Sequence, residues 1–183
     1  MILGFKALPG SGKDTAAEYL KENFGFKHIA FSDTLYKEIS EHYNVPVDIL
    51  KDRKYKDNNE NLIPELKGKT PRTIAQEWGD HRRKQDQCYF IRRVLQILSE
   101  DKNSSFVVSD LRFTNEIELI KSLGGYTVGI KTFGFPDILD NNAKKHISET
   151  QTKDYIPDYF VRNVKGNYKI LFNDLDELLL LCS

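Results

Sequence analysis

The sequence predicts an α/β fold built on a parallel sheet of about five strands, with helices on both faces. Short apolar runs of strand length alternate with longer segments of helical period, which is the pattern of strands joined by crossover helices. A glycine-rich stretch, ALPGSGKDT (7–15), stands between the first apolar run and the first amphipathic segment. The chain has 183 residues, of which 39% are hydrophobic, so it is long enough for one domain with a real core.

The first four predicted elements lie in residues 2–43. Mostly apolar runs at 2–8 and 27–31 predict buried strands. Residues 13–24 between them predict a helix, and Ser32 with Asp33 can cap the helix that follows the second strand. The side chains expected to point inward are Ala16, Ala17, Leu20 and Phe24 in the first helix and Leu35, Tyr36, Ile39 and Tyr43 in the second.

Residues 51–69 differ from their surroundings because they are polar, charged and without an apolar period. They predict a surface insertion or a mobile loop. A helix then restarts, with Thr70 as its N-cap and Pro71 in its first turn. The next segment, 86–100, gives the clearest amphipathic helix, and its apolar face consists of Phe90, Ile91, Val94, Leu95 and Leu98.

The second half of the chain continues the alternation of strands and helices. An apolar strand at 105–110 ends in an acidic residue, and a helix at 114–125 stops at Gly124 and Gly125. The remaining predictions are strands at 126–131 and 159–163, an irregular polar segment at 132–153 and a final helix at 173–182.

Composition narrows the classes of function. The charges of the 27 basic and 27 acidic side chains cancel, whereas proteins that bind nucleic acid are usually more basic. No nucleic-acid partner is therefore expected. Cys88 and Cys182 form neither a C-x-x-C pair nor a Cys/His cluster, which favours a reducing, cytoplasmic compartment. No signal peptide is visible, and the tail ELLLLCS is too short for a membrane span, so no membrane partner is expected.

The stretch 7–15 follows the phosphate-binding pattern G-x-x-x-x-G-K-[ST] with two departures. Gly10 and Gly12 allow a backbone path along which successive N–H groups, around Ser11, point at an anion together with a helix N-terminus. Lys13 supplies a positive charge for the β and γ phosphates of ATP. The alternative is a glycine-rich turn from strand to helix that binds no ligand.

The departures are Ala7, where the pattern has its first glycine, and Asp14, where it has the magnesium-binding Ser or Thr. Alanine is the smallest replacement for a glycine that mainly provides backbone space. The Asp14 carboxylate can hold Mg²⁺ directly or through water, because hard cations prefer oxygen ligands, and the neighbouring Thr15 adds a hydroxyl.

The motif and four further stretches resemble the phage-type deoxynucleoside monophosphate kinases, in which G-K-D-T replaces G-K-[ST]. The motif itself continues as GSGKDTAAEYL (10–20). The further stretches follow in the family's order and span most of the chain: IAFSDTLYKEI (29–39), TPRTIAQEWGDHRR (70–83), VVSDLRFTNEIELIKSLGG (107–125) and HISE (146–149). By this resemblance Asp14 is a family signature and not damage to the motif.

The resemblance implies a three-layer P-loop NTPase fold, with the loop-bearing strand at the centre of the sheet. Residues 1–183 would form a single kinase domain. An acceptor-binding helical insertion is expected at about 33–104 and a lid at about 131–150.

Asp110 and Arg112 follow a buried strand, and ligands of α/β sheets bind at the carboxyl ends of strands. Asp110 would orient Mg²⁺ or its waters, together with Asp14 and Thr15, and Arg112 would neutralise charge on the transferring phosphoryl group. With Lys13 they make the expected catalytic set. The alternative is a helix-capping acid and an exposed, ion-paired arginine.

Arg72 and Gln76 lie four residues apart on one helical face, where an arginine fork suits a monophosphate and a glutamine amide suits a base edge. The resemblance implies that this segment holds the acceptor nucleotide, with Asp33 and Lys37 as further contacts. The alternatives are a solvated helix face for the first pair and a plain N-cap for Asp33. Aromatic side chains that could stack on a base, but are more often core, are Phe31, Tyr36 and Trp78.

The segment 131–150 lies where nucleotide kinases carry a lid that excludes water from the phosphates. Its candidate cations are Lys131, Lys144 and His146, with Lys145 beside them. The family tends to show an arginine near position 131, so Lys131 departs from it. A general base is not needed, because the acceptor phosphate is already largely anionic at neutral pH.

The predicted activity is transfer of the γ-phosphoryl group of ATP, with Mg²⁺, to a deoxynucleoside monophosphate. Alternatives are another small-molecule P-loop kinase, such as a dephospho-coenzyme A or phosphomevalonate kinase, and a nucleotide-binding regulator without turnover. Kinases of this type are often homodimers, although no interface pattern is visible in the sequence. A cytoplasmic location, in a host cell if the chain is phage-encoded, follows from the resemblance.

Overall fold

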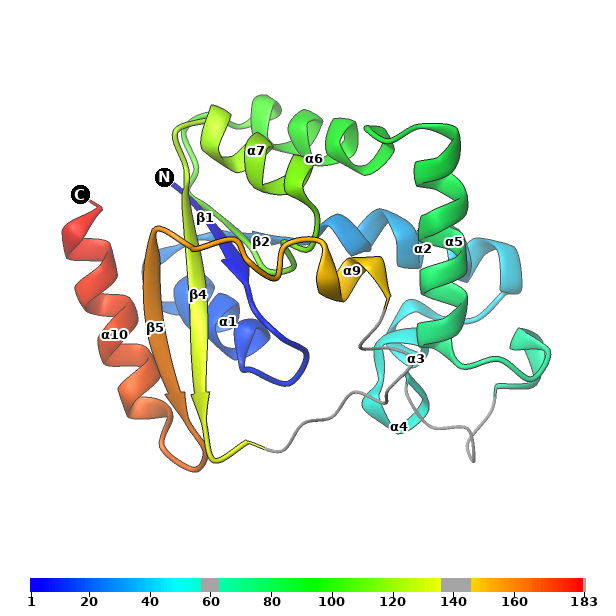
Figure 1. Ribbon diagram of the computed structural model, residues 1–183, viewed down its shortest axis with the longest axis horizontal. Helices are drawn as coiled ribbons and strands as arrows, with labels where there is room; N and C mark the ends of the chain where they lie inside the picture. The colour runs from blue at the N-terminus through cyan, green and yellow to red at the C-terminus, as the bar shows by residue number, and fades with distance from the viewer. Residues whose placement is uncertain (57–62, 136–145, 183) are drawn as a thin grey trace. The chain divides into compact units, whose positions relative to one another are not determined.

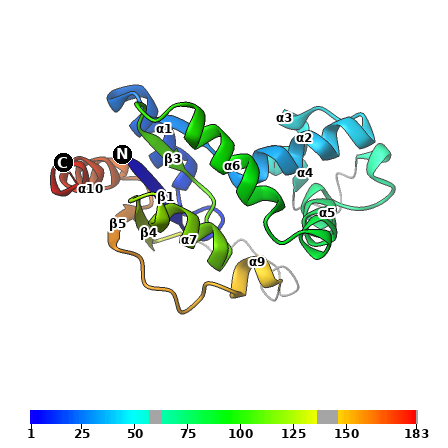
Figure 2. The ribbon, with the colours of Figure 1, turned by 90° about the horizontal axis from the view of Figure 1, so that it is seen from above.

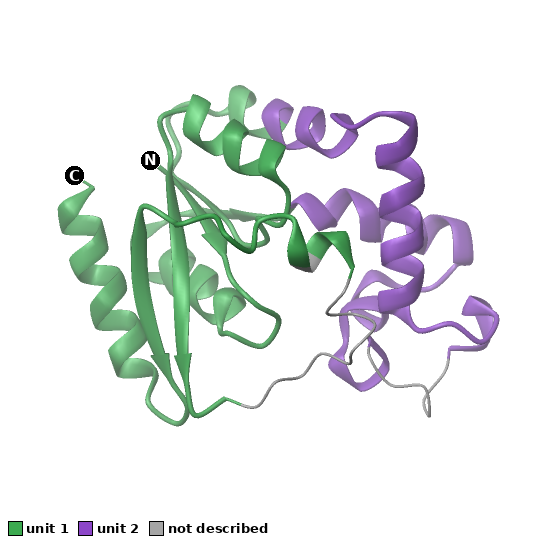
Figure 3. Cartoon of the chain, viewed as in Figure 1, with its two compact units in different colours: residues 1–30, 97–183 green, residues 31–96 purple. Residues whose placement is uncertain are grey.

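The computed structural model describes residues 1–56, 63–135 and 146–182 (Figure 1). The chain divides into two compact units (Figure 3). The first comprises Met1–Ala30 and Ile97–Ser183 and carries the sheet, and the second comprises Phe31–Gln96 and is helical in its described part.

The sheet of the first unit has five strands in the order β2-β3-β1-β4-β5, and every neighbouring pair is parallel. The strand that precedes the glycine-rich loop, β1, is therefore central, as predicted. Register is set by pairs such as Gly4 with Val108 in β3 and Gly4 with Thr127 in β4. The strands are β1 (Ile2–Lys6), β2 (Lys27–Ile29), β3 (Phe106–Val108), β4 (Tyr126–Phe133) and β5 (Tyr159–Val164).

Helices cover both faces of this sheet, which confirms the three-layer prediction. Figure 2 shows α1 (Lys13–Phe24) and α7 (Thr114–Ser122) on opposite sides of β1. The helix α10 (Tyr168–Leu181) packs against β5 and α1, whereas α7 packs against β1 and β4. A short helix, α9 (Ile147–Thr150), precedes β5.

Successive side chains of β1 point to opposite faces of the sheet, so each face receives its own set of residues. Leu3 and Phe5 are fully buried in the main core with side chains of α1 and α10. Gly4, between them, faces the α7 side, where a Cβ atom would lie 2.6 Å from Leu111 Cδ1. The main core consists of Leu3, Phe5, Ala16, Ala17, Leu20, Phe26, Val107, Val128, Val161, Leu171, Leu175 and Leu178.

The second unit is built around two helices, α2 (Phe31–Tyr43) and α5 (Pro71–Gln85), which pack against each other. Thr70 caps α5 as predicted, because its Oγ1 accepts a hydrogen bond from Thr73 N at 3.2 Å. The remaining elements are α3 (Val47–Lys51), α4 (Arg53–Lys56), the 3₁₀ turn η1 (Pro64–Leu66) and α6 (Tyr89–Glu100), whose last residues belong to the first unit.

The described part of the segment 51–69, for which a surface insertion or a mobile loop was predicted, is mostly exposed, as a surface insertion would be, but it holds regular elements. It contains α4 and η1, and the side chain of Leu66 is fully buried while Ile63 is nearly so. Ile63 and Leu66 stand in a segment that is otherwise mostly polar and charged, so they make no periodic pattern that a sequence window would detect. Their burial depends on packing within the helical unit.

Several predicted boundaries also need correction. The second strand ends at Ile29 and α2 begins at Phe31, so Ser32 and Asp33 lie in the first turn of α2 and not at an N-cap. Phe24 was expected to face the core but is 45% exposed, because it is the last residue of α1. The final helix begins at Tyr168, five residues earlier than predicted. Among the described helices, none combines the length and apolar character needed to cross a bilayer.

Candidate functional site

The glycine-rich loop connects the central strand β1 to α1, at the carboxyl edge of the sheet where α/β proteins bind ligands. Gly10 and Gly12 have φ angles of 78° and 93°, in the left-handed region that side chains with a Cβ atom resist. Gly12 O accepts the first helical bond, from Ala16 N at 2.9 Å. This is the backbone path that a phosphate-binding loop requires.

The charged residues after the glycines begin α1. Lys13 Nζ lies 2.6 Å from Asp14 Oδ2, and the two side chains are 15% and 65% exposed. Thr15 follows, half-buried, in the same turn. The loop thus presents a largely covered ammonium group and an exposed carboxylate side by side.

The backbone of the loop is held from β5 by a residue that the sequence analysis did not identify. Asn163 is fully buried and its Nδ2 donates to Ser11 O at 2.8 Å. Ser11 is itself 2% exposed. The available signal was a polar residue on the face of strand 159–163 that Val161 places in the core, but nothing in the sequence links it to position 11.

The segment that follows β3 lies at the same edge of the sheet as the loop. Leu111 N donates to Phe5 O at 3.0 Å, which ties this segment to the end of β1 just before the loop. Asp110 is 9% exposed and Arg112 half-buried. The structure therefore brings the segments that carry Lys13 and Asp110 to the carboxyl ends of paired neighbouring strands.

Two further side chains fix this segment. The carboxylate of the buried Glu116 accepts backbone N–H bonds from Arg112 at 2.8 Å and Phe113 at 3.1 Å. His28 Nε2, in the middle of β2, lies 2.8 Å from Ser109 Oγ, so β2 supports the residue before Asp110. Glu116 thus makes capping bonds at the start of α7.

The predicted acceptor-binding residues all lie in the second unit. Arg72 and Gln76 project from α5 and are half-buried. Gln76 Nε2 is buried and has no hydrogen-bond partner among the residues that the structure describes. Asp33 pairs with Lys51 at 2.8 Å across α2 and α3, and Lys37 is exposed.

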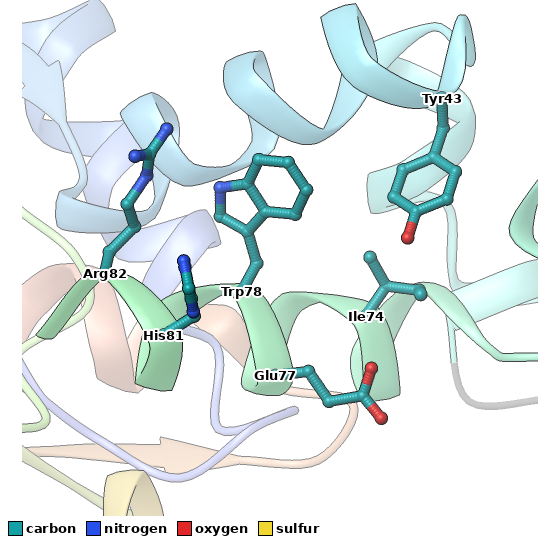
Figure 4. Close-up of a pocket in the computed structure, with 6 residues that line it drawn as sticks. All are labelled: Tyr43, Ile74, Glu77, Trp78, His81 and Arg82. Atoms are coloured by element: carbon teal, nitrogen blue, oxygen red, sulfur yellow. The ribbon is translucent and has the colours of Figure 1, made fainter. Parts of the chain in front are cut away.

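An aromatic pocket of about 340 Å³ lies on α5 and the end of α2 within the second unit (Figure 4). Trp78 lines the pocket, and its ring lies 5.0 Å from the ring of His42, which is outside the lining. Tyr43 points toward Ile74. Phe31 and Tyr36, the other candidates for base stacking, are buried. The residues that line the pocket are Tyr43, Ile74, Glu77, Trp78, His81 and Arg82.

Glu38 organises one wall of this region. Its carboxylate accepts bonds from Trp78 Nε1 and Arg82 Nε, each at 2.8 Å, and from the hydroxyl of Tyr89. Desolvation raises the pKa of this carboxyl, but the hydrogen bonds from Tyr89, Trp78 and Arg82 outweigh it and hold the pKa below its usual value. Three helices of the second unit therefore meet on one ionised carboxylate.

The lid prediction is tested only at its ends. Lys131 lies on β4, paired in register with Arg162, and its Nζ sits 4.3 Å from the ring centroid of Phe160. Position 131 thus belongs to the sheet, as does the strand up to Phe133, which corrects the predicted irregular segment from 132. His146 caps α9, with Ser148 N donating to Nδ1 at 3.2 Å. Lys144 and Lys145 fall outside the described residues.

Comparison with known proteins agrees with this architecture. A protein-family profile described as "AAA domain" matches residues 7–100. The "Putative deoxynucleotide monophosphate kinase" of Acanthamoeba polyphaga mimivirus is 30% identical over 146 residues, which cover 71% of this chain and 73% of that protein.

Two solved structures cover the whole chain. Dephospho-CoA kinase from Campylobacter jejuni is 18% identical, with a TM-score of 0.53 and coverage of 100% of this chain and 97% of that one. TT1252 from Thermus thermophilus is 16% identical, with a TM-score of 0.56 and coverage of 100% and 98%. At these identities the similarity shows the fold alone.

The parallel sheet, the central strand and the glycine-rich loop before α1 define a P-loop protein. The chain belongs to the AAA-domain family, among the P-loop nucleotide kinases, and is an enzyme of that class. Membership implies the use of ATP.

Proposed function

We propose that the protein transfers the γ-phosphoryl group of ATP to a deoxynucleoside monophosphate, giving the diphosphate and ADP. The observation that carries this proposal is the mimivirus relative, whose name includes that substrate class and which matches 71% of the chain. The loop geometry supplies the phosphate-binding half of the argument. The substrate preference, the roles of individual residues and the use of Mg²⁺ are all part of the proposal.

The residues of the loop and of the neighbouring strand end fit both ATP and Mg²⁺, the two groups that the proposed reaction needs. The two glycines with positive φ and the covered Lys13 ammonium suit the phosphates of ATP. For Mg²⁺, the chain offers carboxylate and hydroxyl oxygens on Asp14, Thr15 and Asp110, which is the ligand type that Mg²⁺ prefers. Among the described residues no cluster of three acidic, His or Cys side chains occurs, and Mg²⁺ in kinases commonly takes one or two carboxylates with phosphate oxygens.

When bound, ATP supplies the phosphoryl group and Mg²⁺ neutralises charge as it moves. The loop N–H groups and Lys13 would hold the β and γ phosphates, and the Asp14 carboxylate would accept a bond from the Lys13 ammonium or from a metal-bound water. Asp110 would hold Mg²⁺ or its waters. Arg112, whose backbone N–H donates to Glu116, would neutralise the charge that develops during transfer.

In the second unit, Arg72 would hold the monophosphate of the acceptor, because its guanidinium fork can donate two parallel N–H bonds to phosphate oxygens. Gln76 would hydrogen-bond the base edge, which would give its buried Nε2 the partner that it lacks in the described chain. Lys37 and Asp33 would contact the acceptor's phosphate, sugar or base. Lys131, Lys144 and His146 remain the candidates for closing over the phosphates.

The test is ADP release from ATP and Mg²⁺ against a panel of deoxynucleoside and ribonucleoside monophosphates, with dephospho-coenzyme A included, and chromatography of the product. We expect diphosphate from one or more deoxynucleotides. Lys13→Ala and Arg72→Ala should each lower kcat/KM by about a hundredfold or more.

Matched controls remove charges that the proposal does not use. Lys21→Ala takes an exposed lysine from the last turn of α1, and Arg92→Ala breaks an exposed pair with Asp86. Both should behave as wild type, because exposed ion pairs contribute little. Phosphorylation of dephospho-coenzyme A alone would replace the proposed acceptor, and binding of ATP without any product would contradict the proposal.

A further inference from the structure

Asn163 stands at a point where its strand should be apolar. It lies on the same face of β5 as Val161, which belongs to the main core, and its side chain is fully buried. A buried carboxamide is costly unless its hydrogen bonds are made. Here only one half of the amide is used, because Asn163 Oδ1 has no partner among the described residues. Stability therefore gives no account of an asparagine at this position.

The half that is used acts on the phosphate-binding loop. Asn163 Nδ2 donates to Ser11 O at 2.8 Å, across 152 positions of sequence. In a trans peptide unit the C=O of one residue and the N–H of the next point in opposite directions. The bond to Ser11 O thus turns the N–H of Gly12 away from Asn163.

This orientation matters because an anion site needs N–H groups that face the ligand and carbonyl oxygens that face away from it. Ser11 and Gly12 occupy the middle of the loop, and a reversed peptide between them would aim a carbonyl dipole at phosphate. Gly12 has a φ of 93°, so this peptide has fewer steric barriers to reversal than one flanked by side chains with a Cβ atom. Some contact outside the loop has to select its direction.

The fit between Asn163 and the loop is also tight in space. A Cβ atom on Gly12 would lie 2.2 Å from Asn163 Nδ2, too close for both to be accommodated without movement. The same side chain therefore sets the direction of the Ser11–Gly12 peptide and requires that position 12 have no side chain.

We propose that Asn163 is a positioning residue of the phosphate-binding loop, which orients the Gly12 N–H toward the phosphates of the bound nucleotide. It acts through Ser11 O and does not touch the nucleotide. This inference rests on the loop's role in the proposed function, namely holding the triphosphate, and it is independent of which acceptor is phosphorylated.

Asn163→Asp tests the donor in nearly the same shape. An ionised carboxylate at 163 would repel Ser11 O, whereas a protonated one has an O–H that donates to it. Burial raises the pKa of such a carboxyl, so both forms are reachable in a practical pH range. We expect the Kd of ATP, measured by calorimetry without an acceptor, to rise about tenfold or more relative to wild type at about pH 8. At about pH 5.5 the ratio of the two Kd values should return toward one.

Asn23→Asp is the matched control, because Asn23 Nδ2 also donates to a backbone carbonyl, Tyr19 O at 2.9 Å, but on the exposed side of α1. It should bind ATP as wild type does at both pH values. If the carboxylate of Asn163→Asp prevents folding at high pH, Asn163→Ala provides a second test, and urea unfolding checks that this variant is folded. Its affinity for ATP should fall by a larger factor than that of Asn23→Asp.

Wild-type affinity in both Asn163 variants would overturn the inference, as would a loss of affinity in Asn163→Asp that is the same at both pH values. Neither result would bear on phosphoryl transfer to a deoxynucleotide. Conversely, normal ATP binding by wild type with no turnover of any monophosphate would reject only the proposed acceptor.

Discussion

The backbone N–H of Arg112 donates to Oε2 of Glu116 at 2.8 Å, so a buried carboxylate on the first turn of α7 fixes the segment that carries the predicted catalytic arginine. The same oxygen accepts the N–H of Phe113 at 3.1 Å. One acidic side chain in the first turn therefore satisfies the backbone N–H of the N-cap, Phe113, and that of the residue before it. The cap of α7 and the geometry of the candidate site are the same structural feature.

Glu116→Ala should lower both stability and turnover. One buried and one partly buried N–H group would lose their acceptor, which costs about 1–3 kcal/mol of the free energy of unfolding. The shift of the Arg112 backbone should lower kcat more than it raises the KM of ATP. Urea unfolding and steady-state kinetics measure the two effects, with the exposed Glu118→Ala as control. An unchanged kcat in a folded variant would show that Glu116 only caps the helix.

Glu38→Ala should destabilise the helical unit. The donors from Trp78, Arg82 and Tyr89 would lose their shared acceptor, and we expect a loss of about 1–3 kcal/mol. Trp78 is the single tryptophan of the sequence, so its fluorescence reports on this unit specifically. The urea transition followed by fluorescence should move to lower denaturant, while the exposed Glu41→Ala leaves it in place. Equal urea midpoints for the two variants would mean that the hydrogen bonds to Glu38 contribute nothing to the stability of this unit.

The ion pair of Asp101 should make the stability of the fold depend on pH in the acidic range. Hydrogen bonds from Lys27 and Ser104 lower the pKa of its carboxyl to about 2. Because the folded pKa lies below the unfolded value of about 3.9, the contribution is complete above the unfolded pKa and disappears as the pH falls through the folded one. The difference in urea midpoint between wild type and Asp101→Asn should be constant above about pH 5 and shrink between about pH 4 and 2. A difference that does not change with pH would refute this.

Sequence patterns predicted the features whose causes are local. The glycines of the loop, the Thr70 cap and the strand–helix alternation each depend on residues within a few positions, and each is present in the structure. The bond from Asn163 to Ser11 joins residues 152 positions apart, and no local pattern could pair them. Leu66 was missed for a related reason, since its burial requires the packing of neighbouring helices.

The limits of strands and helices were predicted less well for a physical reason. Phe31 is apolar and follows a strand, so its hydrophobicity alone cannot distinguish a last strand residue from a first helix residue. The fourth strand was predicted to end at Lys131, with an irregular segment from 132, yet pairing with β5 extends β4 to Phe133. Strand length here is set by the partner strand, which is a tertiary property.

Gln76 offers the sharpest test of how the acceptor is recognised. Its Nε2 is buried on α5 and lacks a partner among the described residues, so a bound base edge would recover the hydrogen bond that folding leaves unmade. Gln76→Ala should raise the KM of the preferred deoxynucleotide about tenfold, and it should reduce discrimination between bases. The KM of ATP should not change. Steady-state kinetics with each monophosphate provide both numbers, and Gln85→Ala, at the exposed end of the same helix, is the control. If the acceptor KM and the base preference of Gln76→Ala equal those of wild type, the base is read elsewhere, and the aromatic pocket around Trp78 becomes the next position to substitute.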